Sequence, residues 1–409
     1  MRLDSYRLLL LVPAIRSTLG ASLLARLPVG MGGFAILLFV QQESASFAVA
    51  GMASALYVLG LASVAPFLGR MMDRAGPVLL LKLSAIIYPL WMLGLVALLE
   101  KRAPIFWIGV CSFGAGASLP QVTLCMRTLY PRVLAEASLL QTAYAIDSVL
   151  IESVFVLGPA FVSIFLAADF IAGAIWMAAI SAALGTMWFI RTPMIRDWSV
   201  RGTQRKASVV RVLKEPGIIK LLLATFLYSA GFGFYEMGVT HFTNGLARPA
   251  MAGFALALAS VGSGLGAIAY GARSWSWPLR QQFLLALILM AIGFVGLGVM
   301  MQMPESYFYL FMAANVLAGA PMASVIATQS QLLSRLAPEG MLAESFTWGG
   351  TALLVGISVG LQVGGWMAQS LSPLSILLAG GLGPVGAALC VLWISPIEKL
   401  NVAGNHYEA

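Results

Sequence analysis

Twelve long apolar segments follow one another along this chain, separated by charged or turn-forming residues. Each can cross a bilayer as a helix, which takes roughly 20 consecutive apolar residues. Lipid offers the backbone no hydrogen-bond partners, so segments of this length form helices. The segments cover residues 17–40, 46–68, 78–99, 104–129, 138–166, 168–190, 217–241, 249–272, 281–302, 306–330, 341–369 and 372–395. The sequence therefore predicts an all-α integral membrane protein with twelve transmembrane helices.

The composition excludes several classes of protein. Of the 409 residues, 60% are hydrophobic and 10% are charged, whereas soluble proteins carry about 25% charged residues. This leaves no room for a large soluble catalytic domain or a nucleic-acid-binding domain. Two histidines and three cysteines without CxxC spacing predict no metal site and no cofactor. No nucleophile with an accompanying base is evident, so we expect no enzymatic activity.

The basic residues predict the orientation, because Lys and Arg hold loops on the cytoplasmic side. With the N-terminus in the cytoplasm, only Lys101, Arg102 and Arg248 lie outside and Arg26 lies within the membrane, which leaves 20 of the 24 Lys and Arg residues on the cytoplasmic face. The net charge of +8 thus reflects topology and not a nucleic-acid partner. We expect both termini in the cytoplasm and a plasma membrane of the bacterial inner-membrane type.

A basic interval in the middle of the chain divides it into two halves of six segments. The sequence GASLP at 116–120 and the sequence GAP at 319–321 each precede a basic turn and a long helix, which indicates a weak repeat. We therefore predict two pseudo-symmetric six-helix bundles. The predicted parts are a cytoplasmic lead-in at 1–16, bundles at 17–190 and 217–396, a basic cytoplasmic linker at 191–216 and a cytoplasmic tail at 397–409.

One short motif lies between the second and third segments. Gly69, Asp73, Arg74 and Gly76 match the pattern GxxxDRxGR, with Pro77 where a basic residue is usual. This pattern resembles the loop signature of the major facilitator superfamily. The resemblance implies a twelve-helix transporter in which the aspartate latches the two bundles together. The alternative is a solvated loop whose charges only set the topology.

A second motif lies in the fifth segment. Gly158 and Pro159 resemble the glycine-proline signature of the drug:proton antiporter branch of that superfamily, although Ala160, Phe161 and Val162 replace the glycines usual after the proline. A proline inside a helix frees a carbonyl group, and a glycine permits close packing. The pair therefore suits a helix at a moving interface.

Four charged residues lie inside apolar segments: Arg26, Asp147, Glu152 and Glu236. A charge at the bilayer centre costs about 2.5 to 3.5 kcal/mol, so each requires an explanation. The family resemblance implies that the first, fourth, seventh and tenth helices line a central cavity, which is where Arg26 and Glu236 fall. We predict that Glu236, Glu152 and Asp147 carry protons, and that Arg26 binds an anionic group or forms a salt bridge.

The structural alternative is a permanent ion pair between Arg26 and either acid of the fifth segment. At 100° per residue, Asp147 lies about 140° from Glu152 and on the same face as Gly158. One carboxylate can therefore face the cavity while the other faces a packed helix.

Further polar and aromatic residues are candidates for contacts with a substrate beside Arg26 and Glu236. They are Tyr235, Tyr144, Gln121, Gln331 and Trp348. The alternative is that they only pack between helices, where aromatic side chains and single amides are common.

These features predict a secondary active transporter that works by alternating access. No Walker sequence is present, so gradients would drive transport. We expect proton-coupled efflux of a small amphipathic molecule by a monomer in the lipid bilayer. The alternative is proton-coupled uptake of a small anionic metabolite with Arg26 as its charge clamp. A receptor or an intramembrane enzyme on the same scaffold is the remaining class.

Overall fold

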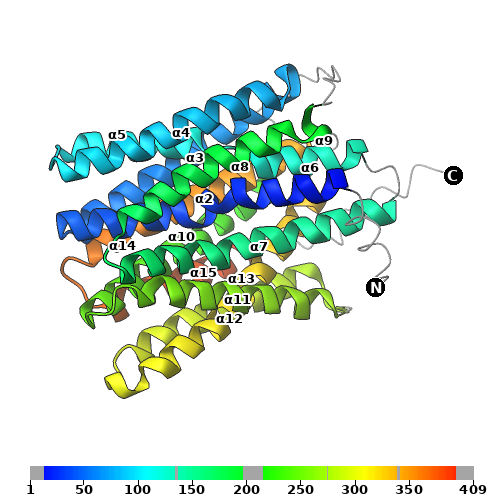
Figure 1. Ribbon diagram of the computed structural model, residues 1–409. Helices are drawn as coiled ribbons and strands as arrows, with labels where there is room; N and C mark the ends of the chain where they lie inside the picture. Colours follow the sequence, from blue (N-terminus) through cyan, green and yellow to red (C-terminus); the bar gives the residue numbers. More distant parts are fainter. Residues whose placement is uncertain (1–12, 134–136, 197–214, 274, 339–340, 393–409) are drawn as a thin grey trace.

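The computed structural model describes residues 13–133, 137–196, 215–273, 275–338 and 341–392. In these ranges the chain is helical and contains no strand. Twelve spans are long and apolar enough to cross a membrane, and the helices run side by side along one axis (Figure 1). This confirms the predicted fold class.

The helices of the first half carry the labels of Figure 1. They are α2 (Pro13–Ser44), α3 (Phe47–Ala75), α4 (Pro77–Glu100), α5 (Ile105–Ser118), α6 (Val122–Val133), α7 (Ala137–Ala167), α8 (Ala172–Arg191) and the short α9 (Pro193–Arg196). The first helix thus begins earlier than the segment 17–40 predicts.

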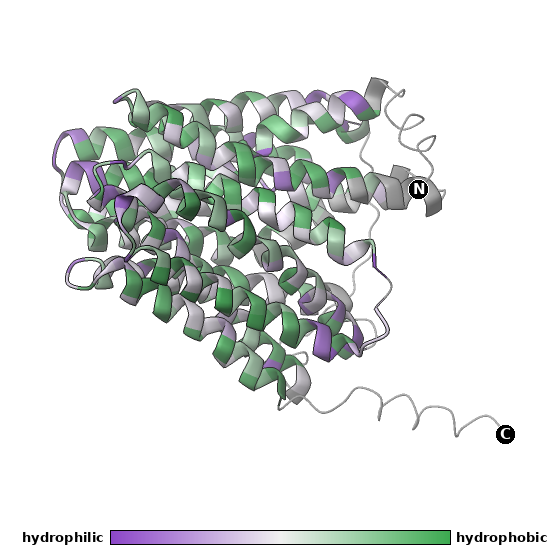
Figure 2. Cartoon of the chain, turned by 90° about the horizontal axis from the view of Figure 1, so that it is seen from below, coloured by the Kyte–Doolittle hydropathy of each residue, from purple (hydrophilic) through white to green (hydrophobic). Residues whose placement is uncertain are grey.

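The second half has one helix for each span. They are α10 (Pro216–Gly245), α11 (Met251–Gly271), α12 (Leu279–Met300), α13 (Phe308–Leu336), α14 (Leu342–Met367) and α15 (Pro373–Leu392), with a 3-10 turn η2 (Glu305–Tyr307) before α13. Hydrophobic residues predominate along the helices, and hydrophilic residues gather toward their ends and in the connections (Figure 2).

The prediction of one continuous helix over 104–129 is wrong. α5 ends at Ser118 and α6 begins at Val122, with Pro120 between them. Proline offers no N–H to continue the helix and disfavours helical backbone at the residue before it. Leu119 accordingly adopts an extended conformation, with φ −57° and ψ 129°. The span Ile105–Met126 nevertheless includes all of α5 and the first residues of α6.

The packing of helices repeats between the two halves. α2 packs on α7 and α8, as α10 packs on α14 and α15. α3 packs on α5 as α11 packs on α13, and α4 packs on α8 as α12 packs on α15. The halves meet along two helix pairs, α3 with α14 and α7 with α11. The relation that matches α3 to α11 and α7 to α14 converts one pair into the other. This pattern has the twofold pseudo-symmetry that the weak sequence repeat predicts.

Candidate functional site

A buried ion pair joins the first and fifth spans. Arg26 Nη1 on α2 donates to Asp147 Oδ1 on α7 at 2.7 Å, and the two side chains are 1% and 3% exposed. The Tyr130 hydroxyl on α6 donates to the same carboxylate oxygen at 3.3 Å. The sequence leaves open which acid partners Arg26, and the structure selects Asp147. One carboxylate therefore links three helices.

Two glycines bring α2 and α7 close enough for this pair. A Cβ on Gly158 would collide with the backbone of Gly30, and a Cβ on Gly30 would collide with the backbone of Val154. Small residues allow helices in membranes to approach at this distance. Asp147 and Gly158 both contact α2, so they share one face of α7 as the 100° spacing predicts.

Arg26 retains unused hydrogen-bonding capacity. Its Nε and Nη2 atoms are buried and have no hydrogen-bond partner among the described residues. A guanidinium carries five N–H donors, and leaving buried donors unpaired costs free energy. The cluster is therefore a place where an acceptor group of a ligand, or a water molecule, would be stabilised.

The second half holds a neutral polar pair in its interior. The Tyr235 hydroxyl on α10 donates to Asn315 Oδ1 on α13 at 2.7 Å, and Asn315 Nδ2 donates to the carbonyl oxygen of Phe311 at 2.8 Å. The ring of Tyr235 stacks on Phe294 of α12 with centroids 5.2 Å apart. The sequence predicts a role for Tyr235 but not for Asn315, which is an uncharged residue in an apolar run.

Glu236 follows Tyr235 on α10 and is partly buried. Tyr235 faces α13, and Met237 packs against Gly364 of α14. Glu236 lies between them, about 100° from each around the helix axis, so it occupies the face of α10 between the side toward α13 and the side toward α14. Among the described residues its carboxylate has no ion-pair or hydrogen-bond partner. Its protonation state can therefore change without breaking a salt bridge in this structure.

Glu152 is partly buried on α7 and does not share the contact of Asp147 with α2. No ion pair of its carboxylate occurs in the described part of the chain. The two acids of the fifth span thus have different environments, as their spacing on the helix predicts.

The other predicted contact residues are dispersed over separate helices. Gln121 lies in the break between α5 and α6 and donates from Nε2 to the carbonyl oxygen of Leu119 at 3.3 Å. Gln331 is exposed on the last turns of α13, and Trp348 packs against the core from the first turns of α14. The side chain of Tyr144 lies outside the described residues. Within the described set, no hydrogen bond links these residues to Arg26 or Glu236.

The motif between the second and third spans is helical and not a loop. α3 continues to Ala75, so the backbone of Gly69, Asp73 and Arg74 lies in its last turns. Gly76 ends the helix with φ 79° and donates its N–H to the carbonyl oxygen of Met72 at 3.0 Å. Glycine adopts positive φ without steric cost. The side chains of Asp73 and Arg74 lie outside the described residues, so the latch stays a prediction.

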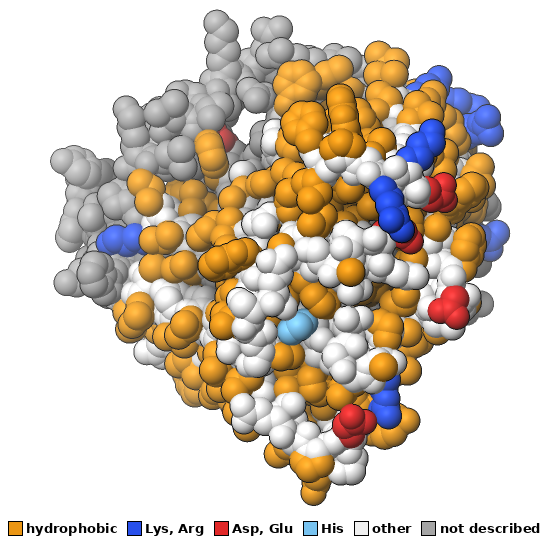
Figure 3. All heavy atoms as spheres, turned by 90° about the vertical axis from the view of Figure 1, so that its left-hand side faces the viewer, with side chains coloured by type: hydrophobic (Ala, Val, Ile, Leu, Met, Phe, Trp, Pro, Cys, Tyr) orange, Lys and Arg blue, Asp and Glu red, His pale blue; other side chains and the backbone are white. Residues whose placement is uncertain are grey.

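The two halves are in close contact at the end of the molecule away from the termini. A Cβ on Gly51 of α3 would collide with the backbone of Leu361 on α14. Nearby, Ser358 Oγ donates to the carbonyl oxygen of Ala55 at 2.8 Å, and Gln369 Nε2 donates to Ser46 Oγ at 3.1 Å. Figure 3 looks onto this end and shows side chains and backbone filling its centre.

The predicted glycine-proline pair lies at the second contact between the halves. A Cβ on Gly253 of α11 would collide with the carbonyl oxygen of Pro159 and with the hydroxyl of Ser163 on α7. Gly158 faces α2 in its own half, whereas the backbone of Pro159 faces the opposite half. The sequence alone did not identify Gly253, because its contact depends on how two distant helices are placed.

The arrangement of these helices can be compared with that of known proteins. No protein-family model matches the sequence, and no curated protein matches it significantly. Among solved structures, the chain is similar to the crystal structure of a mutant of the nucleoside transporter NupG, with a TM-score of 0.70 and 13% sequence identity. The match covers 93% of this chain and 99% of the other. The chain therefore shares the fold of that structure, and its described part contains twelve spans that are long and apolar enough to cross a membrane.

Proposed function

We propose that this chain is a secondary active transporter that works by alternating access and couples proton entry to the export of a small amphipathic molecule. The observation that carries the proposal is Glu236, an intramembrane carboxylate without a salt-bridge partner among the described residues. Such residues mark proton and ion pathways in transporters. Glu236 is the proposed proton carrier, with Glu152 as a second candidate.

The contacts between the halves support alternating access. They bring α3 against α14 and α7 against α11 at the end away from the termini. In the proposed orientation, with both termini in the cytoplasm, this end is the outer one, and the contacts support a state closed to the outside. Transport then requires these glycine-mediated contacts to separate and the cytoplasmic end to close. We propose that Asp73 and Arg74 act at the cytoplasmic end in that second state.

The ion pair of Arg26 favours a substrate without strong negative charge. Asp147 compensates the charge of Arg26, so the pair as a whole attracts anions weakly. The unpartnered N–H groups of Arg26 still favour a substrate that carries hydrogen-bond acceptors. A molecule with an apolar body and a few polar acceptors fits these conditions.

The second candidate function is proton-coupled uptake. A solved structure that shares this fold is that of a nucleoside transporter, and a nucleoside is a candidate substrate because it would offer oxygen and nitrogen acceptors to Arg26. A small anionic metabolite is the other candidate substrate for uptake. Both functions use the same proposed proton carrier, and the direction of flux separates them.

The test is transport by purified protein in liposomes that contain a pH-sensitive dye, with an imposed proton gradient. A panel of amphipathic cations, neutral compounds, nucleosides and small anions is added, and substrate and proton fluxes are recorded together. For the wild type, we expect substrate and protons to move in opposite directions across the membrane. For Glu236→Gln, we expect no proton flux. Glu152→Gln in the same assay tests the second candidate, because a loss of proton flux in that variant alone would assign the proton carrier to Glu152. Fluxes in the same direction would establish uptake, and an unchanged proton flux in Glu236→Gln would refute its role.

A further inference from the structure

An apolar groove opens between α11, α12 and α13, and its volume is about 710 Å³. This lies within the range of ~300–1,000 Å³ that is typical of small-molecule sites. Small residues provide the space, including Gly266 on α11, Gly293 and Gly296 on α12, and Ala318 on α13. α12 packs on α13 and α15 of its own half and lies at the edge of the molecule (Figure 1). The groove therefore faces the surroundings of the protein and not its centre.

The rim of the groove is apolar and exposed. Leu317 on α13 is 78% exposed, and Ile292 and Leu289 on α12 are 61% and 48% exposed. All three belong to membrane spans. Apolar side chains exposed on a membrane span meet lipid chains, so the groove is open to the hydrocarbon of the bilayer.

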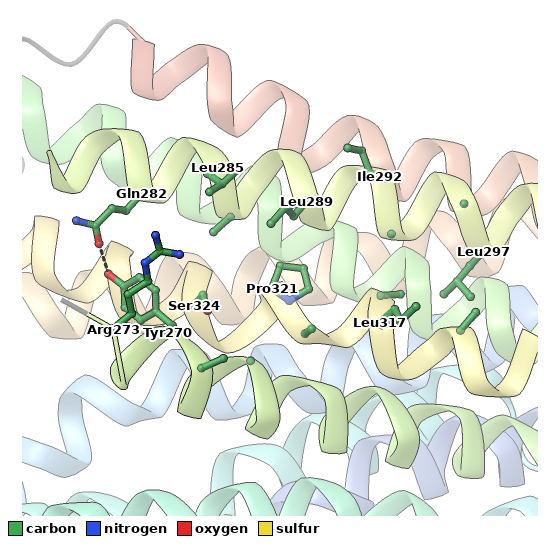
Figure 4. Close-up of a pocket in the computed structure, with 18 of the residues that line it drawn as sticks. Tyr270, Arg273, Gln282, Leu285, Leu289, Ile292, Leu297, Leu317, Pro321 and Ser324 are labelled. Atoms are coloured by element: carbon green, nitrogen blue, oxygen red, sulfur yellow. Dashed lines mark hydrogen bonds between the residues drawn. The ribbon is translucent and has the colours of Figure 1, made fainter. Parts of the chain in front are cut away.

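One end of the groove is polar and aromatic. Figure 4 shows Arg273, Tyr270 and Gln282 together at this end, with leucine and isoleucine side chains along the rest of the groove. The Tyr270 hydroxyl donates to Gln282 Oε1 at 2.6 Å, and Arg273 lies over the ring of Trp275 at 5.0 Å. Trp and Tyr are enriched where a membrane protein meets the lipid headgroups. This end of the groove is therefore at headgroup level.

The charge of Arg273 has no acidic partner in the described part of the chain. Its guanidinium is exposed beside the groove. The turn from α11 to α12 lies at the same end of the molecule as the termini (Figure 1), which the orientation places in the cytoplasm. The cytoplasmic leaflet carries the anionic lipids that attract basic residues next to the membrane.

We propose that this groove binds one anionic phospholipid. An acyl chain lies along the apolar trough between α12 and α13, and the phosphate of the headgroup contacts Arg273. The aromatic cluster of Tyr270 and Trp275 packs beside the glycerol region. The site is separate from the proposed transport pathway, because the groove opens on the lipid-facing side of the second half.

The first experiment measures lipid binding to the full-length protein by native mass spectrometry. Phosphatidylglycerol and phosphatidylcholine with identical chains are added to delipidated protein. We expect one phosphatidylglycerol to bind with roughly fivefold preference, the effect of one basic residue near anionic lipid. Arg273→Ala should lose this preference. Arg248→Ala should keep it, because Arg248 is also exposed and lies over an aromatic ring, that of Phe308 at 4.8 Å, but is not among the groove residues.

The second experiment fills the groove. A Cβ on Gly296 meets no atom within 4 Å, so Gly296→Phe places its ring in the groove without a backbone clash. We expect it to lose both lipids, whereas Gly264→Phe, at another open glycine that does not line the groove, keeps them. Lipid binding by Gly296→Phe equal to wild type, or an unchanged preference in Arg273→Ala, would overturn the proposal. If Gly296→Phe changes the ratio of monomer to dimer but leaves lipid binding unchanged, the groove binds a second copy of this chain and not a lipid.

Discussion

The two halves place their first helix against their fifth through the same glycine contact. In the first half, Gly158 of α7 meets the backbone of Gly30 of α2. In the second half, Gly360 of α14 meets Gly233 of α10 in the same way. Each position recurs after roughly the same offset in sequence, so the contact belongs to the repeated scaffold.

The polar residues beside this contact differ. One helical turn before its glycine, α2 carries Arg26 and α10 carries Ser229; three turns before its glycine, α7 carries Asp147 and α14 carries Gly349. Ser229 donates to the carbonyl oxygen of Phe226 within its own helix and forms no ion pair with any described residue. The second half therefore builds the same packing without the ion pair. The pair is not required by the scaffold, and its presence in one half indicates a role specific to that half.

The largest effect should come from breaking the ion pair. Asp147→Ala leaves Arg26 buried without a counter-charge, which costs about 3–5 kcal/mol in buried pairs. We expect a large drop in the thermal transition of the purified protein. The double variant Arg26→Met, Asp147→Leu removes both charges and should recover most of that loss. Equal destabilisation by the single and double variants would mean that packing, not charge compensation, holds the two helices.

The sequence predicts the helices and the faces of this cluster but not its pairing. The twelve spans follow from apolar length, and the shared face of Asp147 and Gly158 follows from helical geometry. The choice of Asp147 over Glu152 as the partner of Arg26 depends on how α7 is rotated against α2, which no local pattern encodes. For the same reason, the sequence does not predict the contact of Gly253 with the opposite half.

Two further differences have local explanations. Pro120 breaks the fourth span, whereas Pro28, Pro159 and Pro321 lie inside continuous helices, so a proline alone does not locate a break. Asn315 was not predicted, because its local sequence gives no sign of its partner Tyr235, which lies 80 residues away on another helix. An isolated amide in an apolar run is the signal that points to it, since such side chains form hydrogen bonds across helices.

The next effect tests whether the glycine contacts are equivalent in the two halves. Gly158→Val and Gly360→Val each introduce side-chain atoms against a neighbouring backbone, and overpacking typically costs about 1–3 kcal/mol. We expect both to lower the thermal transition to a similar degree. Gly350→Val is the control, because a Cβ there meets no atom within 4 Å. A strong effect in one half alone would show that the two contacts are not the same structural element.

A smaller effect is expected from the neutral pair of the second half. Tyr235→Phe removes the hydrogen bond to Asn315 Oδ1 but keeps the ring that stacks on Phe294. Hydrogen bonds between membrane helices contribute about 0.6 kcal/mol on average and about 1.7 kcal/mol at most. Thermal denaturation should show a loss in this range, well below that of Asp147→Ala. A loss as large as that of Asp147→Ala would mean that the neutral pair stabilises the second half as strongly as the ion pair stabilises the first.

The smallest effect on stability should come from Glu236→Gln, although it also removes an acid from a membrane span. Its carboxylate forms no ion pair among the described residues, so its replacement leaves no partner charge uncompensated, and we expect a change within about 0.5 kcal/mol. Asp147→Asn in the same assay should be strongly destabilising. If Glu236→Gln unfolds as readily as Asp147→Asn, Glu236 holds the fold together, and its loss of proton flux would no longer identify a proton carrier. If it is neutral, any loss of coupling in that variant belongs to transport itself, and the two acids divide into one that maintains structure and one that is free to titrate.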